Sequence, residues 1–501
     1  MPAPGVKRFA SADTPGVAVI GGGIAGLAAA TLLAERGARV TLYEQEESLG
    51  GRLAGWRTRL ADGGEATMSR GFHAFFRQYY NLRGLLRRTD PALDRLRQLP
   101  DYPLQHSGGL TDSFARVPRT PPFSALGFVA LSPTFGWRDL AAMDARAALP
   151  LLDVRVPEVY ERFDSVSATH FLERVRFPEA AHHLAFEVFS RSFFADPREL
   201  SAAELLLMFH IYFLGSSEGL LFDVPTAPFP QALWDPLGAY LQRLGTQVRT
   251  GTPVRAVQPC DGGGGRGVEV RTDLAVDRHD AAVLALDVGA LRGLVAASPG
   301  LGTAGWRDDV AGLRTAPRFL VSRLWLDRPV RADRAAFLGT SGYDGLDNVS
   351  VLDRYEDEAA RWSARSGGSV VELHAYAVPE DARPEAVQSR LVERLHQVYP
   401  ETRRARAVDA RHEWRSDCPL FPVGSYVRRP TVTTAHPQVT LAGDAIRCDL
   451  PVALMERAAT TGFLAANALL AGWGVQGQVL WTVPRAGRSP VLRALGTVGS
   501  R

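Results

Sequence analysis

The chain has 501 residues, of which 46% are hydrophobic and 22% are charged. This composition predicts a globular protein with more than one structural unit, because one hydrophobic core rarely serves so long a chain. The 57 basic and 54 acidic residues nearly balance, which argues against a nucleic-acid-binding surface. Lys7 is the only lysine and the three cysteines are far apart, so we exclude Schiff-base chemistry, a disulfide framework and a CxxC redox or zinc pair.

Residues 17–45 predict a strand, a glycine-rich turn, a helix and a second strand. The turn has the spacing Gly21-x-Gly23-x-x-Gly26, and Glu44 ends the second strand. The first glycine permits a tight turn, the second lets the backbone approach a pyrophosphate, and the third lets the helix pack closely on the strand. We therefore expect a dinucleotide with its phosphates at the helix N-terminus and its ribose hydroxyls on the Glu44 carboxylate.

A second small-residue motif, Gly50-Gly51-Arg52, follows at once. Two glycines and a cation suit another close approach of backbone to phosphate, with the arginine as charge partner.

Residues 70–83 then contain five aromatic rings, a histidine and three arginines. The rings have the spacing of one helix face, which predicts an aromatic helix. Three uses stay open for it at this point: a hydrophobic core, a site for a cofactor and an apolar substrate, or a surface for single-stranded nucleic acid. The rings are Phe72, Phe75, Phe76, Tyr79 and Tyr80.

Several motifs in the middle of the chain are rejected. The glycine run at 262–267 precedes an alternating segment and predicts a hairpin loop. The segment GSSEG at 215–219 has the spacing of a nucleophile elbow, but no helical pattern follows it. His182 and His183 are adjacent and diverge on a helix, so we expect no metal site. The apolar segment 205–215 is shorter than the roughly 20 residues that span a bilayer, so no transmembrane helix is predicted.

The second half of the chain alternates strands and helices. Residues 318–329, 348–354 and 370–378 read as strands, and residues 383–400 read as a covering helix. Near the end, residues 439–469 predict a buried strand that ends in Gly443-Asp444, and then a long helix opened by Pro451.

The glycine motif with its acidic residue, the GGR segment and the terminal LAGD…P…MERA pattern together resemble the flavin-containing amine oxidase and carotenoid desaturase superfamily. This resemblance implies FAD and an α/β fold with two parts. A discontinuous Rossmann-like FAD-binding domain is expected at 14–95, 228–300 and 410–475. An α+β substrate-binding domain is expected at 96–227 and 301–409, followed by a C-terminal tail at 476–501.

The resemblance also implies the cofactor contacts. Asp444 is expected at the ribityl and phosphate region of FAD, Leu454 and Met455 beside the flavin ring, and Val254 against the adenine. Gly71 is expected to bring backbone against the cofactor. The full predicted set is Gly21, Gly23, Gly26, Glu44, Gly50, Gly51, Arg52, Gly71, Val254, Gly443, Asp444, Leu454 and Met455.

The carotenoid branch matches better than the amine oxidase branch, whose members generally place a lysine near the flavin, because this chain has no lysine after Lys7. The segments GFHAFFRQYYNLR and PVALMERAATTGFLAANALL resemble the bacterial β-carotene ring desaturase/methyltransferases. The implied reaction is oxidation of the β-ionone ring with a 1,2-methyl shift to an aromatic end group, and His73 or Asp449 is the expected proton acceptor. The alternatives are an acyclic carotenoid desaturase or isomerase, a flavin amine oxidase, and a non-catalytic lipid-binding protein on the same fold.

A carotenoid substrate predicts contact with a membrane. About 40 carbons exposed to water cost on the order of 30 kcal/mol, so such a hydrocarbon stays in a bilayer or an apolar tunnel. We therefore expect a cytoplasmic enzyme that docks on the bilayer without spanning it, through residues 121–137 or the segment around 205–222. For the second segment a buried core helix is the stronger alternative.

Overall fold

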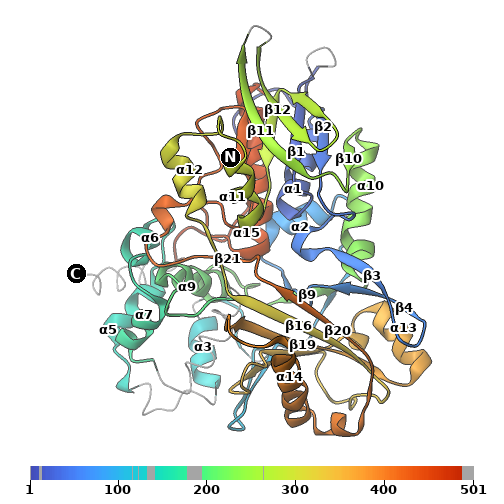
Figure 1. Cartoon of the computed structure of the whole chain (residues 1–501). Helices are drawn as coiled ribbons and strands as arrows, with labels where there is room; N and C mark the ends of the chain where they lie inside the picture. Colours follow the sequence, from blue (N-terminus) through green and yellow to red (C-terminus); the bar gives the residue numbers. More distant parts are fainter. Residues whose placement is uncertain are drawn as a thin grey trace.

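The computed structural model describes residues 2–10, 14–115, 117–121, 123–132, 141–177, 194–262 and 265–487. His182 and His183, and part of the proposed membrane segment 121–137, lie outside these residues. Two sheets organise the described part of the chain, one in the upper and one in the lower half of Figure 1.

The upper sheet is parallel throughout and has the order β10-β2-β1-β14-β22. Its central strands are buried on both faces, as is usual for parallel sheets. Helices pack on one face, and Val257, Val268 and Val270 of an antiparallel sheet pack on the other. Helix α1 packs between this sheet and the long α15. The strands are β1 (Gly16–Ile20), β2 (Arg39–Tyr43), β10 (Gln247–Arg249), β14 (Ala281–Leu284) and β22 (Val439–Leu441). The helices are α1 (Ile24–Glu35), α2 (Tyr80–Leu86), α10 (Asp235–Arg243), α11 (Val288–Ala296), α12 (Ala304–Ala311) and α15 (Leu454–Gly472).

A three-stranded antiparallel sheet projects from the upper half. It consists of β11 (Val254–Gly262), β12 (Gly265–Thr272) and β13 (Val276–His279). The glycine run at 262–267 lies where β11 turns into β12, so the predicted hairpin is confirmed.

The lower sheet is mostly antiparallel and has the order β20-β16-β19-β18-β17-β7-β8. Helix α14 (Pro384–Val398) covers it by packing Leu391 and Leu395 into its core. The predicted strands at 318, 348 and 370 and the predicted covering helix are therefore confirmed. The strands are β7 (Pro103–His106), β8 (Thr111–Ser113), β16 (Arg318–Leu326), β17 (Phe337–Ser341), β18 (Asn348–Val351), β19 (Ser369–Val378) and β20 (Ala407–Arg415).

A helical lobe and short strands complete the described chain. The lobe contains α3 (Phe123–Leu131), α5 (Ala145–Ala148), α6 (Glu158–Phe163), α7 (Ala168–Val175) and α9 (Ala202–Phe209), and α13 (Asp357–Ser366) lies beside the lower sheet. The short strands are β3 (Gly55–Arg59), β4 (Glu65–Ser69), β5 (Phe75–Phe76), β6 (Leu96–Gln98), β9 (Phe222–Pro225), β15 (Arg314–Thr315) and β21 (Pro419–Leu420). This α/β plus α+β architecture agrees with the predicted fold class, while the exact domain boundaries stay a prediction.

Three local predictions were wrong. The aromatic stretch is not a helix, because Phe75 and Phe76 pair with β9 as strand β5, and only α2 that follows is helical. The terminal helix begins at Leu454 rather than at Pro451. The segment 205–214 is a helix that continues as a π-helical turn and is almost wholly buried, so the docking surface proposed there is wrong and the alternative of a buried core helix is confirmed.

Candidate functional site

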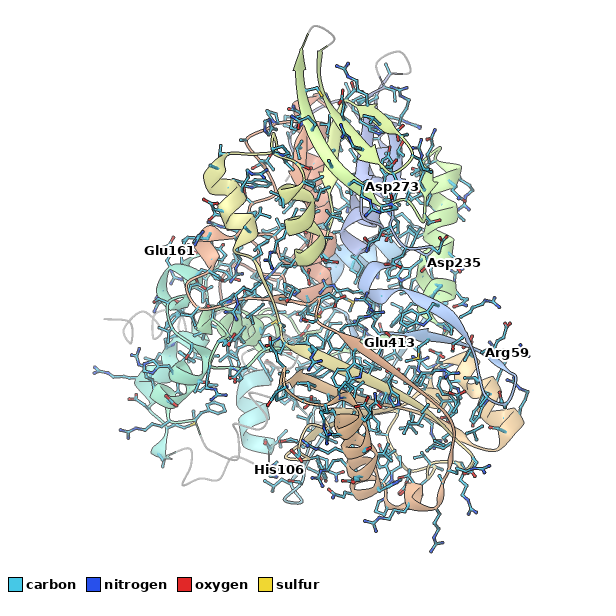
Figure 2. The ribbon with its side chains drawn as sticks, in the orientation of Figure 1. Arg59, His106, Glu161, Asp235, Asp273 and Glu413 are labelled. Carbon is cyan, nitrogen blue, oxygen red and sulfur yellow. The ribbon has the colours of Figure 1, made fainter. Side chains whose placement is uncertain are left out.

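A cavity of about 540 Å³ lies between the two sheets and is lined by residues from both. At one end it meets the carboxyl ends of the parallel strands, where ligands of open α/β sheets bind. His106, a lining residue at the other end, lies at the lower edge of the molecule in Figure 2. The cavity thus joins the upper sheet to the lower one.

The glycine turn after β1 has the geometry that its motif predicts. Gly21 has φ +105°, and a Cβ there would lie 2.2 Å from the Ala285 carbonyl oxygen. A Cβ on Gly26 would lie 1.8 Å from the Gly21 oxygen, so α1 packs against the turn too closely for any side chain. Gly23 is the N-cap of α1 and no side chain caps this end. The first N–H groups of α1 are therefore available to an anion.

The second glycine motif lies against the first. The Gly50 N–H donates to the Gly22 carbonyl at 2.9 Å, and both Gly50 and Gly51 have positive φ angles of +114° and +56°. A Cβ on Gly50 would lie 2.5 Å from the Trp234 ring. Segments about 27 residues apart in sequence thus form one continuous backbone surface on the cavity.

The Glu44 carboxylate lines the same end and is held by backbone. Its Oε2 accepts from the Gly22 N–H at 2.6 Å and its Oε1 accepts from the Glu46 N–H at 2.9 Å. Burial raises the pKa of Glu44, while these N–H donors oppose the rise. Val254 lines this end as well. A carboxylate fixed beside the glycine turn is the arrangement that binds a ribose.

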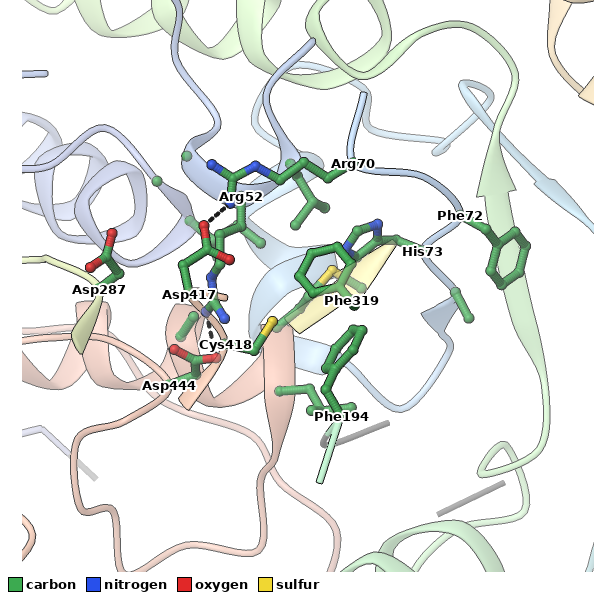
Figure 3. Close-up of a pocket in the computed structure, with 18 of the residues that line it drawn as sticks. Arg52, Arg70, Phe72, His73, Phe194, Asp287, Phe319, Asp417, Cys418 and Asp444 are labelled. Carbon is green, nitrogen blue, oxygen red and sulfur yellow. Dashed lines mark hydrogen bonds and ion pairs between the residues drawn. The ribbon is translucent and has the colours of Figure 1, made fainter. Parts of the chain in front are cut away.

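Arg52 and Asp444 form an ion pair at the middle of the cavity. Their Nη2 and Oδ2 atoms are 2.5 Å apart, although 392 residues separate them in sequence. Arg70 and Asp417 form a second pair beside the first (Figure 3). The structure thus brings the N-terminal GGR motif and the C-terminal aspartate motif into one site.

The N-terminus of α15 reaches the cavity next to this pair. Leu454, Met455 and Ala458 line it, and no side chain caps the helix. Leu454 has φ +52°, a conformation that costs a non-glycine residue about 1–2 kcal/mol. The positive end of a 19-residue helix is suited to stabilise negative charge on a ring placed here.

Aromatic side chains line the lower end of the cavity. Phe72 stacks on Phe337 with ring centroids 4.1 Å apart, and Phe76 lies 4.7 Å from Tyr212. The centroids of the Phe194 and Phe319 rings lie 4.9 Å apart. The lining rings are Phe72, Phe76, Tyr79, Tyr102, Phe114, Phe194, Tyr212, Phe222, Phe319, Phe337 and Tyr376. This end suits an apolar ligand with a large π system.

Most predicted site residues line the cavity, and three do not. Gly26 supports the turn from behind, and Gly71 packs against the His374 ring instead of facing the cavity. Asp449 is half exposed; it accepts from the Tyr426 hydroxyl at 2.5 Å and lies 3.3 Å from the Arg447 Nε. His73 does line the cavity, and its Nδ1 lies 2.9 Å from the Gly71 oxygen. The other predicted residues, Gly21, Gly23, Glu44, Gly50, Gly51, Arg52, Val254, Gly443, Asp444, Leu454 and Met455, all line it.

The sequence reasoning missed three polar residues of β19. Glu372, His374 and Tyr376 alternate along a strand that is otherwise apolar, and His374 and Tyr376 line the cavity. Alternate residues of a strand share one face. The pattern E-x-H-x-Y could have indicated these residues. Polar residues are rarely buried, so three of them at alternate positions of a buried strand indicate a cluster of polar groups on one face.

The residues of the upper end fit FAD. They provide two glycine surfaces for a pyrophosphate, a fixed carboxylate for a ribose, and an uncapped helix N-terminus for a flavin ring. Gly21, Gly50 and Gly443 adopt left-handed φ angles that keep this surface free of side chains.

Comparison with known proteins agrees with this geometry. Residues 24–470 match the family described as flavin containing amine oxidoreductase. The chain is 71% identical to a carotenoid phi-ring synthase of Streptomyces griseus over 99% of this chain and 96% of that one. It is 25% identical to a 15-cis-phytoene desaturase of Synechococcus elongatus over 48% of this chain and 50% of that one. A double mutant of putrescine oxidase has a similar fold, with a TM-score of 0.67 at 16% identity over 91% of this chain and 99% of that one.

Proposed function

Because the chain belongs to the flavin-containing amine oxidoreductase family, we propose that it uses its FAD to oxidise the end ring of a carotenoid. The family match confirms the predicted FAD and the predicted oxidoreductase class. The ring, rather than the linear polyene, is proposed as the target. The similarity to the carotenoid phi-ring synthase extends over nearly the whole chain, whereas the similarity to the phytoene desaturase extends over half of it.

The continuity of the cavity is the observation that carries this proposal. The end that fits a dinucleotide and the aromatic-lined end that fits a hydrocarbon form a single space. This continuity supports the proposal that an apolar ring lies against the flavin. Leu110 lines the cavity at the β7–β8 turn and is 36% exposed. A long polyene can therefore enter from this edge and keep its far end in an apolar environment.

The proposed chemistry begins at a ring C–H bond. Bound FAD supplies the oxidant, since it accepts the hydride. The faces of Phe319 and Phe337 are suited to stabilise the cation that remains, by about 0.5–2 kcal/mol for each well-placed ring. A methyl group then moves to the adjacent cationic carbon, and loss of a proton gives a second ring C=C bond. Loss of a second hydride and a second proton, in a further turnover of FAD, makes the ring aromatic. Of the two side chains predicted to accept that proton, only His73 lines the cavity.

Expression in a host that accumulates β-carotene tests this function. We expect carotenoids with aromatic end groups, identified by chromatography and mass spectrometry. Additional linear double bonds would instead assign an acyclic desaturase. Hydrogen peroxide release with polar amines would assign an amine oxidase, and a protein that purifies without flavin would assign a lipid carrier.

We also propose that the chain docks on a bilayer through α3. None of the helices in the described part of the chain combines the length and the apolarity needed to cross a bilayer. Helix α3 has no charged residue, and its Phe123 and Leu131 are 61% and 56% exposed. It lies in the lower half of the molecule, as does His106 at the cavity edge (Figures 1 and 2).

Co-flotation with liposomes of neutral phospholipid tests the docking surface. We expect the wild-type protein to float with the vesicles and the double variant Phe123→Ser/Leu131→Ser to stay behind. The control is Leu274→Ser, which removes an exposed apolar side chain from the distant β12–β13 turn. Equal flotation of all three proteins would refute the α3 surface.

A further inference from the structure

Three polar side chains of β19 form a connected chain that leads from the protein interior to the cavity. Glu372 and His374 are almost fully buried, and Tyr376 is half-buried. His374 and Tyr376 line the cavity at its aromatic end. The Tyr376 ring lies 4.6 Å from the Phe194 ring, and the Phe194 ring lies 4.9 Å from the Phe319 ring, between centroids. Tyr376 is therefore one of the cavity rings proposed to surround the substrate.

The inner end of this chain is a fixed negative charge. The Arg323 Nε and Nη2 atoms donate to Glu372 Oε2 at 3.0 and 2.8 Å, and the Phe72 N–H donates to Oε1 at 2.8 Å. Burial opposes ionisation of Glu372, but the Arg323 charge outweighs it and lowers the pKa of Glu372 to about 2. Glu372 is therefore a carboxylate at neutral pH and can only accept hydrogen bonds.

That carboxylate determines the tautomer of His374. Glu372 Oε1 lies 2.9 Å from His374 Nε2, so Nε2 carries the proton and donates. The His374 Nδ1 is then an acceptor, and it lies 2.7 Å from the Tyr376 hydroxyl. The hydroxyl proton consequently points to Nδ1. The Tyr376 oxygen also accepts from Asn348 Nδ2 at 3.0 Å, which leaves one of its two lone pairs available.

A β-bulge places Tyr376 at the cavity. In the pairing of β16 with β19, Tyr376 and Ala377 together stand opposite Phe319. Ala377 has φ +49°, which costs about 1–2 kcal/mol. The Tyr376 N–H, which the bulge removes from the ladder, donates to the Asp347 carboxylate. Bulges of this kind are common next to active sites, where they redirect a side chain.

Gly71 leaves the room that the Glu372 and His374 side chains need. It has φ +89°, and a Cβ there would lie 2.5 Å from His374 Cε1 and 3.0 Å from Glu372 Oε1. Only glycine at this position lets Phe72 bring its N–H to Glu372 while His374 stays in place.

The two side chains expected to accept the proton compare poorly with this arrangement. Asp449 lies outside the cavity lining. His73 makes its Nδ1 contact with a backbone carbonyl rather than a carboxylate, and burial lowers the pKa of His73 to about 4. The hydrogen-bond partner of His73 is a backbone carbonyl and that of Asp449 is the Tyr426 hydroxyl, whereas His374 is bonded directly to the Glu372 carboxylate.

We propose that Tyr376, His374 and Glu372 act as a proton relay that accepts the ring proton in the last step of aromatisation. The proposal rests on the proposed ring oxidation. In this step a ring C–H bond of the cation breaks, and its electron pair becomes a ring C=C bond. The proton goes to the Tyr376 oxygen while the Tyr376 proton moves to His374 Nδ1. The imidazolium is then paired with the Glu372 carboxylate, and the step consumes no oxidant. Tyr376 is the catalytic residue, and His374 and Glu372 are positioning residues that act through it.

The test compares Tyr376→Phe with the wild-type holoenzyme on β-carotene in liposomes. The substitution keeps the ring and removes the hydroxyl. We expect kcat for aromatic end groups to fall by about 100-fold or more, with KM and the flavin content of the purified protein unchanged. Ring products that have lost hydrogen but are not aromatic should accumulate. Tyr240→Phe is the matched control, because Tyr240 does not line the cavity. The substitution removes a hydroxyl that donates a hydrogen bond to Glu35 at a distance of 3.0 Å.

A second variant tests whether the residues act as a unit. His374→Asn should reduce kcat as strongly as Tyr376→Phe, and the double variant should be little worse than either single one, because residues of one relay are not additive. Melting temperatures show whether each variant is folded. Undiminished aromatisation by Tyr376→Phe, or fully additive losses, would overturn the relay while leaving the ring oxidation intact. A wild-type enzyme that forms no aromatic end group would overturn both.

Discussion

The two ends of the cavity are built in different ways. At the upper end the backbone forms the surface, through glycines whose Cβ positions are occupied by main-chain atoms or by the Trp234 ring, and through two uncapped helix N-termini. At the lower end side chains form the surface, contributed by strands of the second sheet and by segments distant in sequence. A backbone surface tolerates no added atoms, whereas a side-chain surface can be altered by degrees. Substitutions at the upper end should therefore abolish cofactor binding when they add atoms to the backbone surface, whereas substitutions at the lower end should change activity by degrees.

The largest effect is expected for Gly26→Ala. Its Cβ would lie 1.8 Å from the Gly21 carbonyl oxygen, so α1 and the turn must separate. We expect the purified protein to hold less than about a tenth of the wild-type FAD, a loss of at least ~1.4 kcal/mol in binding free energy. The flavin-to-protein absorbance ratio measures this.

The control for that variant is Gly293→Ala. Gly293 lies in α11, and a Cβ there meets no atom within 4 Å. This change should leave FAD binding intact and stabilise the helix by about 0.5–1 kcal/mol. Full flavin content in Gly26→Ala would contradict the argument that the upper end is a rigid backbone surface.

The next effect concerns the buried ion pair below the relay. Arg323→Met leaves the Glu372 carboxylate in the protein interior without its cation, and breaking such a pair costs about 3–5 kcal/mol of stability. Urea unfolding measures the loss. The matched control is Arg255→Met, which breaks an exposed pair with Asp273 and should cost at most about 1 kcal/mol. Equal losses in both variants would mean that Glu372 is not held as a buried anion.

The upper end could be predicted because its contacts are local in sequence. Each glycine of the turn has a backbone role at a fixed spacing, so the residues that meet in space are already neighbours in the motif. The exceptions were the pairing of Arg52 with Asp444 and the places of Val254, Leu454 and Met455, since only the resemblance to a known superfamily placed these distant segments on one cofactor.

The lower end could not be predicted in the same way. The rings at 72–80 have helical spacing, but pairing with β9, about 150 residues later in the chain, makes Phe75 and Phe76 a strand. Tertiary pairing overrode local periodicity there. The relay was missed because its meaning depends on Arg323, Asp347 and Gly71, which come from three other segments. Read alone, residues 369–378 are only a buried strand with three polar interruptions.

A smaller effect is expected for Glu44→Gln. The substitution keeps the shape of the side chain and removes the charge that the ribose hydroxyls would meet. A charge-assisted hydrogen bond contributes about 1.5–3 kcal/mol, so the Kd for FAD should rise by roughly 10- to 100-fold. Titration of the apoprotein with FAD measures the change. Glu47→Gln, an exposed neighbour outside the cavity lining, is the control. An unchanged Kd for Glu44→Gln would show that the Glu44 carboxylate does not bind the ribose of FAD.

The smallest effect is a dependence of the free energy of unfolding on pH that arises from His73. Burial lowers the pKa of His73 to about 4 from its ordinary 6.5, and the nearby charges are those of His374, Arg52 and Glu372. Between these two values the unfolded chain binds a proton at His73 and the folded chain does not. The free energy of unfolding should therefore fall as the pH is lowered from 6.5 to 4, by at most ~1.4 kcal/mol per pH unit from this group.

His73→Gln should lack that part of the decrease, and the difference between the two proteins should vanish above pH 7. Urea unfolding across this pH range measures it, with His170→Gln, an exposed histidine of α7, as the control. If His73→Gln follows the wild-type curve, His73 is not held neutral by burial. It would then be as available for proton transfer as the sequence suggested. If the decrease is lost as expected, His73 is a weak base in the folded protein. Tyr376 is then the better candidate to accept the ring proton, because its partner His374 is hydrogen-bonded to the Glu372 carboxylate.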